Sequence, residues 1–249
     1  MAAGKIDPIE QFAIKPIFNL PIFGVPFTNS ALFMLITVGL VALVMVWGTS
    51  GRSIVPGRLQ ALAEQLYEFV AGTVRSTLGE EGMRFLPLVF SLFSFVLVAN
   101  LVGLVPGSYT VTSQLIVTLA FALLVMGVLV GVGLYKHGLS FFRLFVPSGV
   151  PKALYPIIIP IEVISFLSRP ASLSIRLFAN MLAGHIALKV FAYFIVGLVA
   201  AGGWAALSPL PMVMIVALYA LELLVAVLQA FVFSVLTCIY LNDALHPHH

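Results

Sequence analysis

The chain contains 249 residues, of which 61% are hydrophobic and only 8% are charged, and its mean hydropathy is +1.16. Soluble domains carry roughly 25% charged residues, so this composition excludes a soluble globular protein and predicts an all-α polytopic membrane protein. A transmembrane β-barrel is excluded as well, because it would show short alternating segments instead of long apolar runs. The formal net charge of +3 gives no reason to expect nucleic acid as a partner. The single cysteine, Cys238, allows no internal disulfide bond.

The first part of the chain predicts a terminal segment, one membrane crossing and a surface helix. Residues 1–29 contain four prolines and are expected to form an extracytoplasmic segment. Residues 30–48 are apolar throughout and are long enough to cross a bilayer. In residues 57–78, leucine, phenylalanine and valine recur at helical spacing with charged residues between them. This pattern predicts an amphipathic helix that lies on the membrane surface or packs on a neighbour.

Two further apolar stretches complete a scaffold domain that we assign to residues 30–152. Residues 85–105 and 111–135 each predict a membrane-crossing helix, and a turn at 106–110 joins them. None of the three crossings up to this point contains an Asp, Glu, Lys, Arg or His residue. We therefore expect this domain to serve as a support.

The remaining residues, 153–249, divide into two long apolar segments, 153–195 and 210–242, followed by a short cytoplasmic tail. Helices of these lengths would measure ~65 Å and ~50 Å, whereas the hydrocarbon core of a bilayer is only ~30 Å thick. We expect both helices to cross the membrane steeply tilted and kinked, and to form a hairpin. The alternative is that prolines cut the first segment into a surface piece and a crossing; these are Pro156, Pro160 and Pro170.

The distribution of lysine and arginine predicts the orientation of these five crossings. Loops 49–84 and 136–152 carry seven basic residues: Arg52, Arg58, Arg75, Arg84, Lys136, Arg143 and Lys152. The opposite side carries only Lys5 and Lys15. Because cytoplasmic loops are enriched in lysine and arginine, we expect the N-terminus outside and the C-terminus in the cytoplasm.

Arg176 is the most informative residue, because it lies in the middle of the fourth crossing without an acidic neighbour. On a helix, the residues three and four positions away are Ser172, Leu173, Ala179 and Asn180. A guanidinium stays protonated at cellular pH, and placing it mid-bilayer costs at least ~3 kcal/mol. The sequence therefore predicts that Arg176 meets a carboxylate elsewhere, on another protein.

Other polar side chains of the last two segments predict an ion or substrate path; they are Glu162, Arg169, Asn180, His185, Lys189, Glu222 and Gln229. His185 and Glu222 are expected at the same depth on the two antiparallel helices. Imidazole and carboxyl groups can exchange protons there, directly or through water; the alternative is a structural hydrogen-bonded pair. Glu222 and Gln229 are seven residues apart and therefore share a helix face.

The remaining polar residues also have structural interpretations. Arg169 could bond the backbone near the following proline or, like Lys189, extend its charge toward the membrane interface. Asn180 and Gln229 could form helix–helix hydrogen bonds, and Glu162 is either an interfacial residue or a titratable port. The chain has no zinc-ligand spacing and no nucleotide-binding motif, so we expect neither a metal nor a cofactor.

Four segments resemble motifs of one known family. They are residues 168–185 (SRPASLSIRLFANMLAGH), 228–233 (LQAFVF), 100–106 (NLVGLVP) and 7–12 (DPIEQF). The similarity is to the a subunit of the membrane sector of F-type ATP synthase, in the form found in α-proteobacteria and mitochondria. That form has His at 185 and Glu at 222, where many other bacterial members have Glu and His.

The resemblance implies a non-catalytic, proton-conducting subunit without a cofactor. Arg176 would face the carboxylates of a rotating c-subunit ring and would separate two offset half-channels. The implied inlet half-channel from outside consists of Asn180, His185, Glu222 and Gln229. The implied outlet half-channel consists of Glu162, with Ser165 and Ser172 in support. Arg169 and Lys189 are possible supporting residues.

The resemblance also implies the surroundings of the chain. Its partners would be the c-subunit ring, peripheral-stalk b-type subunits, membrane lipid and protons, and its location the bacterial inner membrane or, alternatively, the mitochondrial inner membrane. Two hypotheses of other classes remain: a self-contained secondary transporter for an organic anion, and an assembly subunit without a transport role. The first three crossings contain no inverted copy of the polar hairpin, which argues against the transporter.

Overall fold

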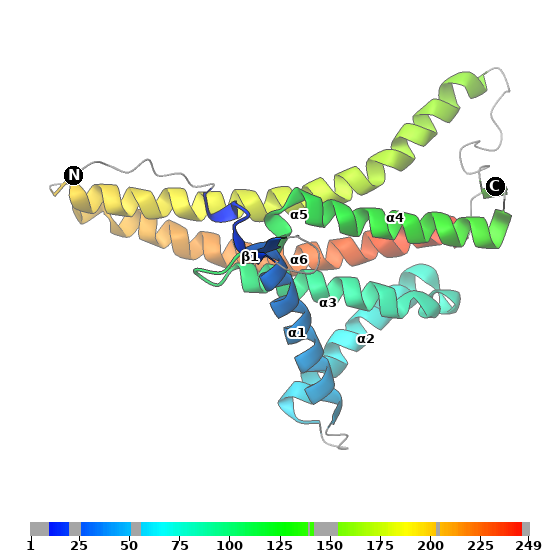
Figure 1. The fold of residues 1–249 in the computed structure, drawn as a ribbon, viewed down its shortest axis with the longest axis horizontal. Helices are drawn as coiled ribbons and strands as arrows, with labels where there is room; N and C mark the ends of the chain where they lie inside the picture. The colour runs from blue at the N-terminus through cyan, green and yellow to red at the C-terminus, as the bar shows by residue number, and fades with distance from the viewer. Residues whose placement is uncertain are drawn as a thin grey trace. The chain divides into compact units, whose positions relative to one another are not determined.

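The computed structural model describes residues 10–19, 26–50, 56–138, 140–141, 154–202 and 205–245. Its α-helices are α1 (Asn29–Ser50), α2 (Arg58–Leu78), α3 (Leu86–Gly103), α4 (Leu115–His137), α5 (Tyr155–Ala200) and α6 (Pro209–Leu245) (Figure 1). Short 3₁₀ helices are η1 (Glu10–Phe12), η2 (Glu80–Phe85), η3 (Val111–Ser113) and η6 (Ala205–Leu207). The predicted helical membrane architecture is confirmed.

Within the described residues, five helices are long and apolar enough to cross a membrane: α1, α3 with the preceding η2, α4, α5 and α6. This agrees with the five predicted crossings. α2 is the predicted amphipathic helix, because its buried residues recur at helical spacing on one side; they are Ala63, Val70, Ala71, Val74 and Leu78. Its other side carries exposed polar residues such as Arg58, Gln65 and Ser76.

The N-terminal segment contains a small antiparallel hairpin that the sequence did not predict. Strand β1 (Pro16–Asn19) pairs with β2 (Pro26–Thr28). Asn29, at the start of α1, holds the hairpin to the helix. Its side-chain amide donates to the carbonyl of Ala13 at 3.1 Å, and its side-chain oxygen accepts from the amide of Lys15 at 3.1 Å.

α5 is one continuous helix of 46 residues that includes Pro160 and Pro170. The alternative in which prolines cut this segment is therefore wrong. An internal proline removes one backbone hydrogen bond and crowds the preceding turn, but a long helix retains its bonds on either side. At 1.5 Å per residue, α5 is ~69 Å long, so its steep tilt in a bilayer stays a prediction.

The chain divides into two compact units, and each unit combines segments that are far apart in the sequence. Unit 1 comprises the described residues within Met1–Val41, Phe95–Gln114 and Leu177–Gln229, and unit 2 those within Ala42–Ser94, Leu115–Arg176 and Ala230–His249. The core of unit 1 contains Leu104, Met181 and Ala226, and a core of unit 2 contains Leu129, Phe141, Phe166 and Ala244.

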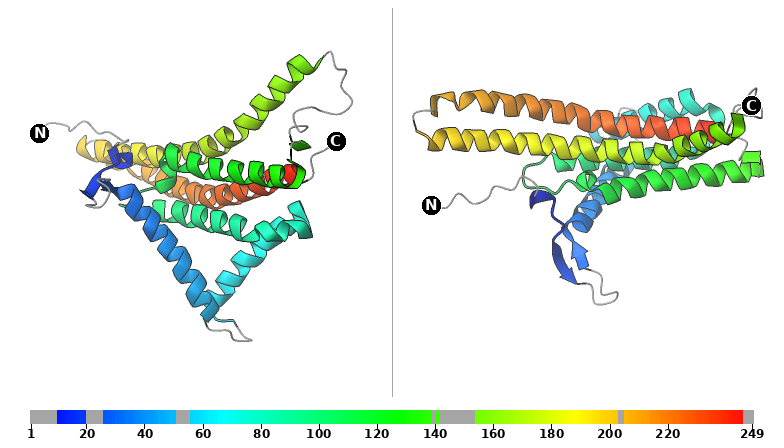
Figure 2. Two further views of the ribbon diagram at one scale, coloured as in Figure 1. Left: turned by 45° about the vertical axis from the view of Figure 1, so that its right-hand side comes forward. Right: turned by 90° about the horizontal axis from the view of Figure 1, so that it is seen from above.

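These cores show how α5 and α6 pair. In unit 1 the second half of α5 packs on the first half of α6, and in unit 2 the start of α5 packs on the end of α6. The two helices are thus antiparallel neighbours, which confirms the predicted hairpin (Figure 2).

Several cations that decided the predicted orientation lie outside the described residues, namely Lys5, Arg52, Arg143 and Lys152. Two of the others are ion-paired within unit 2. Arg75 lies 2.8 Å from Glu80, and Lys136 lies 3.1 Å from Glu81. The orientation of the termini stays a prediction.

Candidate functional site

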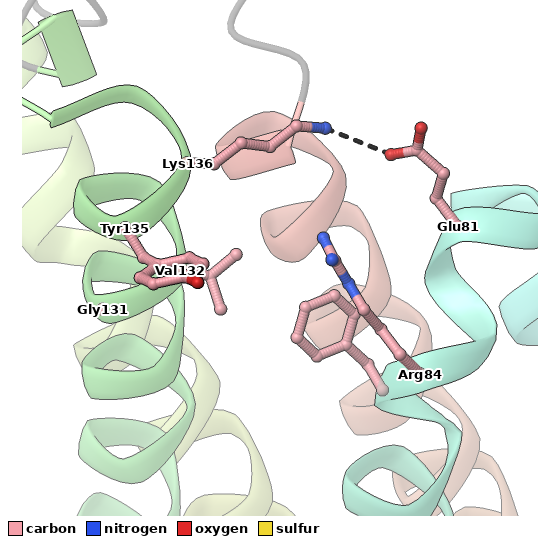
Figure 3. Close-up of a pocket in the computed structure, with 7 residues that line it drawn as sticks. Glu81, Arg84, Gly131, Val132, Tyr135 and Lys136 are labelled. Carbon is pink, nitrogen blue, oxygen red and sulfur yellow. Dashed lines mark hydrogen bonds and ion pairs between the residues drawn. The ribbon is translucent and has the colours of Figure 1, made fainter.

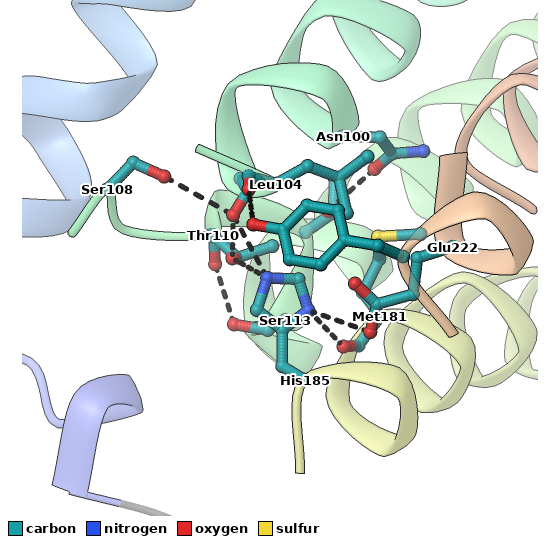
Figure 4. A network of polar contacts seen from close by, with 11 residues as sticks. Asn100, Leu104, Ser108, Thr110, Ser113, Met181, His185 and Glu222 are labelled. Atoms are coloured by element: carbon teal, nitrogen blue, oxygen red, sulfur yellow. Dashed lines mark hydrogen bonds and ion pairs between the residues drawn. The ribbon is translucent and has the colours of Figure 1, made fainter. Parts of the chain in front are cut away.

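His185 on α5 is the centre of a polar network in unit 1 (Figure 4). Its Nδ1 lies 2.9 Å from the carbonyl oxygen of Met181, one turn earlier. Its Nε2 lies 2.9 Å from the carbonyl oxygen of Gly103 and 3.0 Å from Oγ1 of Thr110. The end of α3 and the turn after it therefore supply the groups that orient this imidazole.

The hydrogen-bond partners of His185 are two carbonyl oxygens and one hydroxyl group. Carbonyl oxygens only accept hydrogen bonds, so Met181 and Gly103 are both satisfied when each ring nitrogen carries a proton. In the neutral form with the proton on Nδ1, Nδ1–H donates to Met181 and Nε2 accepts from the hydroxyl of Thr110, but the carbonyl oxygen of Gly103 then receives no hydrogen from the ring.

Glu222 on α6 is the acidic neighbour of this imidazole. Its Oε1 lies 3.8 Å from Nδ1 of His185, and the residue is only 6% exposed. Both carboxyl oxygens are buried and have no hydrogen-bond partner among the described residues. A Cβ atom at Gly184 would overlap this carboxyl group, so a larger residue there would force the carboxyl group to move. The structure brings together the two residues that the sequence predicted at one depth.

Two cavities in unit 1 meet at His185. The larger, of about 290 Å³, is lined by His185, Lys189, Tyr219 and Ser108, and by Gln11 from η1, whose side-chain nitrogen is buried without a partner among the described residues. The smaller, of about 180 Å³, is lined by His185, Glu222 and Asn180. A water molecule occupies ~30 Å³ of liquid, so both cavities can hold water on either side of the imidazole.

The wall of the larger cavity is braced by the N-terminal segment. The ring of Phe12 lies edge-on to His185, with 6.1 Å between ring centroids. The carbonyl oxygen of Phe12 accepts hydrogen bonds from the side-chain amide of Gln114 at 2.8 Å and from the hydroxyl of Tyr109 at 3.2 Å. Burial raises the pKa of Tyr109 above its usual value, so this phenol remains a neutral donor at physiological pH.

Arg176 lies on α5, in unit 2, and its side chain is exposed. Its guanidinium reaches Ser172, one turn earlier, at a distance of 3.5 Å. None of the ion pairs among the described residues involves Arg176. The cation predicted to need an external partner therefore has no carboxylate within the described part of this chain.

Arg169, by contrast, has a carboxylate partner that the sequence did not single out. Its Nη1 lies 2.7 Å from Oδ2 of Asp243 near the end of α6. The guanidinium also lies over the ring of Tyr240, with 5.2 Å from Cζ to the ring centroid, and 5.8 Å from that of Phe166. This cluster joins α5 to α6 within unit 2, seven residues before Arg176.

We expect the Arg169–Asp243 pair to stabilise unit 2 measurably. Arg169→Gln and Asp243→Asn should each lower the free energy of unfolding by about 1–2 kcal/mol, because each leaves a partly buried charge without its partner. In a double-mutant cycle the combined loss should be smaller than the sum of the single losses. Denaturant unfolding of the purified chain in micelles measures this; Glu68→Gln, at an exposed position on α2, is the control. Strictly additive losses would contradict the coupling.

The other predicted site residues have differing surroundings. Glu162 is partly buried near the start of α5, and Ser165 is exposed one turn later. Gln229 on α6 is 7% exposed. In unit 1 the structure brings Asn180 and Lys189 to cavities that His185 also lines. In unit 2 it brings Ser172 to Arg176.

Comparison with known proteins assigns the chain to a family. The sequence model described as "ATP synthase A chain" matches residues 31–242. The chain is 61% identical over 249 residues to a protein of Xanthobacter autotrophicus named ATP synthase subunit a, covering 98% of this chain and 99% of the relative. It is 60% identical over 252 residues to the protein of the same name from Mesorhizobium japonicum, covering 100% of both.

The chain belongs to the ATP synthase A chain family. The resemblance drawn from the arginine-containing segment is therefore confirmed. The match to the ATP synthase A chain family includes α1 to α4 as well as the polar hairpin, so it covers the supporting helices together with the network around His185.

Sequence reasoning missed several groups of this site. Thr110 and Gly103 supply contacts to His185, and Gln11 lines the larger cavity. The only sequence signal for Thr110 was that it is a polar residue in the turn at 106–110, at the predicted depth of His185. A backbone carbonyl such as that of Gly103 leaves no signal in a sequence.

Proposed function

We propose that this chain is the proton-conducting stator subunit of a rotary ATP synthase. Two offset half-channels load and unload the carboxylates of a c-subunit ring, and Arg176 separates them. The chain performs no ATP chemistry itself, which belongs to other subunits. Membership of the ATP synthase A chain family favours this function over the organic-anion transporter, for which we find no supporting observation.

The observation that carries the proposal is the position of His185 between two cavities. A proton from outside reaches His185 through the cavity lined by Gln11 and Lys189, and continues past Glu222 and Asn180. The imidazole is held by hydrogen bonds from both ring nitrogens, and the carboxyl group of Glu222 lies 3.8 Å away. Gln229, seven residues after Glu222 on the same helix face, extends this inlet.

The proposed outlet consists of Glu162, Ser165 and Ser172. These residues precede Arg176 on α5, whereas His185 of the proposed inlet follows it. A neutral ring carboxyl can turn into lipid at little cost, whereas a carboxylate cannot. The permanent charge of Arg176 holds the ring carboxyl deprotonated between inlet and outlet and repels protons. Each proton that crosses a potential of ~100 mV supplies ~2.3 kcal/mol.

The proposed partners follow from this mechanism. The c-subunit ring supplies the counter-charge of Arg176, and peripheral-stalk b-type subunits hold the chain against rotation. The relatives from Xanthobacter autotrophicus and Mesorhizobium japonicum are bacterial, which supports a location in the bacterial inner membrane rather than the mitochondrial one. The N-terminus lies outside and the C-terminus in the cytoplasm.

Disulfide crosslinking to the ring tests the proposal. Ser172→Cys and Ala179→Cys flank Arg176 at exposed positions of α5, and each should crosslink to a cysteine beside the carboxylate of a small two-helix proteolipid. The native Cys238 is fully buried and is replaced by serine to remove background. Leu35→Cys on α1, at a position 61% exposed, is the control and should not react. Equal yields at positions 35 and 172, or none at 172 and 179, would contradict the proposal.

A further inference from the structure

A groove in unit 2 is lined by none of the residues of the network around His185. It is bounded by η2 on one side and by the end of α4 on the other, and its volume is about 530 Å³ (Figure 3). Arg84 and Lys136 contribute its cations, Glu81 its carboxylate, and Phe85 and Val132 apolar surface. Gly131 adds no side chain and leaves the groove open on the α4 side.

The groove lies at the boundary of the membrane. Arg84 precedes the first residue of α3 by two positions, and Lys136 is the last residue but one of α4. Both helices are apolar enough to span a bilayer, so their charged ends mark the level of the lipid headgroups. Tyr135, beside Lys136, is 95% exposed, and exposed tyrosines are enriched at this level of a membrane.

The charges around the groove leave one cation uncompensated. Glu80 is paired with Arg75 at 2.8 Å, and Glu81 is paired with Lys136 at 3.1 Å. Arg84 lies over the ring of Phe85, with 4.9 Å from Cζ to the ring centroid, and takes part in none of the ion pairs among the described residues. The groove therefore combines a net positive rim with an apolar wall that continues along two membrane-spanning helices.

We propose that this groove binds the phosphodiester headgroup of an anionic phospholipid. The guanidinium of Arg84 binds the phosphate oxygens through its planar fork of N–H donors. The ammonium of Lys136 reaches the same phosphate, because the side chains of Arg84 and Lys136 extend into the same space (Figure 3). The acyl chains lie along Phe85 and Val132. A zwitterionic lipid fits less well, because the carboxylate of Glu81 is already paired with Lys136 and is not available to the cationic part of the headgroup.

Lipid binding to the purified full chain tests this inference. Native mass spectrometry with mixed phosphatidylglycerol and phosphatidylcholine should show preferential retention of phosphatidylglycerol. Arg84→Gln should lower that preference about fivefold, the effect of one basic residue near anionic lipid. Arg58→Gln on α2 removes the same charge outside the groove and should leave the preference unchanged.

Three results would overturn the inference. Equal losses in Arg84→Gln and Arg58→Gln would show only a general attraction of anionic lipid to basic side chains. Displacement of phosphatidylglycerol by millimolar inorganic phosphate would indicate a site for the free anion. Absence of phosphatidylglycerol from the assembled complex, with a protein crosslinked through position 84, would assign the groove to a protein partner. None of these outcomes depends on proton transport, so the proposed function is tested separately.

Discussion

Replacing Arg176 by alanine is expected to abolish ATP-driven proton pumping by the assembled complex. The side chain is exposed and has no carboxylate partner among the described residues of its own chain, so its charge is available to a ring carboxylate. In the proposed mechanism, a ring site without that charge opposite it can carry its proton directly between the two proposed half-channels, and rotation is no longer coupled to proton flow. Fluorescence quenching of a pH-sensitive dye in inverted membrane vesicles measures the pumping.

Two comparisons make this expectation specific. Arg176→Lys should also fail, because lysine presents a point charge that can deprotonate when buried, whereas arginine remains charged in a planar fork. Arg58→Ala, at an exposed position on α2, should pump normally. Passive proton leak through the Arg176→Ala complex should persist. Coupled pumping in that variant, with the subunit present at normal levels, would contradict the role proposed for Arg176.

Replacing Glu222 by glutamine is expected to reduce proton flux by at least ~100-fold, the usual contribution of a positioned proton-transfer group. Glutamine has nearly the shape of glutamate and fits beside Gly184, so packing is preserved while the titratable group is lost. His185→Gln should have a similar effect, because His185 lines both cavities of the proposed inlet. The same vesicle assay measures both variants, with Glu68→Gln as the control.

The double variant His185→Glu with Glu222→His distinguishes two interpretations of this pair, a path for protons and a purely structural contact. It retains one acid and one imidazole in contact, so it should recover much of the flux lost in either single variant, with a changed dependence on pH. If the Glu222→Gln variant retained full proton flux, the 3.8 Å contact between His185 and Glu222 would have only a structural role.

The sequence was sufficient for the membrane architecture because hydrophobic length is a local property. The first three crossings could be read from uninterrupted apolar runs, and the last two from long segments that remain predominantly apolar despite their polar residues. The amphipathic period of residues 57–78 predicted α2 (Arg58–Leu78). The hairpin β1–β2 escaped prediction because its strands are only 4 and 3 residues long, too short for an alternating pattern. The continuity of α5 through Pro160 and Pro170 depends on the bonds and packing of the whole helix.

What the sequence by itself determined is the chemistry: an arginine, a histidine and a glutamate on two long apolar helices, and a family signature around them. Only the tertiary structure decided the partners of these groups. It joined Arg169 to Asp243, 74 residues later, and His185 to Gly103 and Thr110, 82 and 75 residues earlier. The physical reason is that charge and hydrophobicity belong to each residue, whereas a hydrogen bond between distant segments depends on how the helices between them pack.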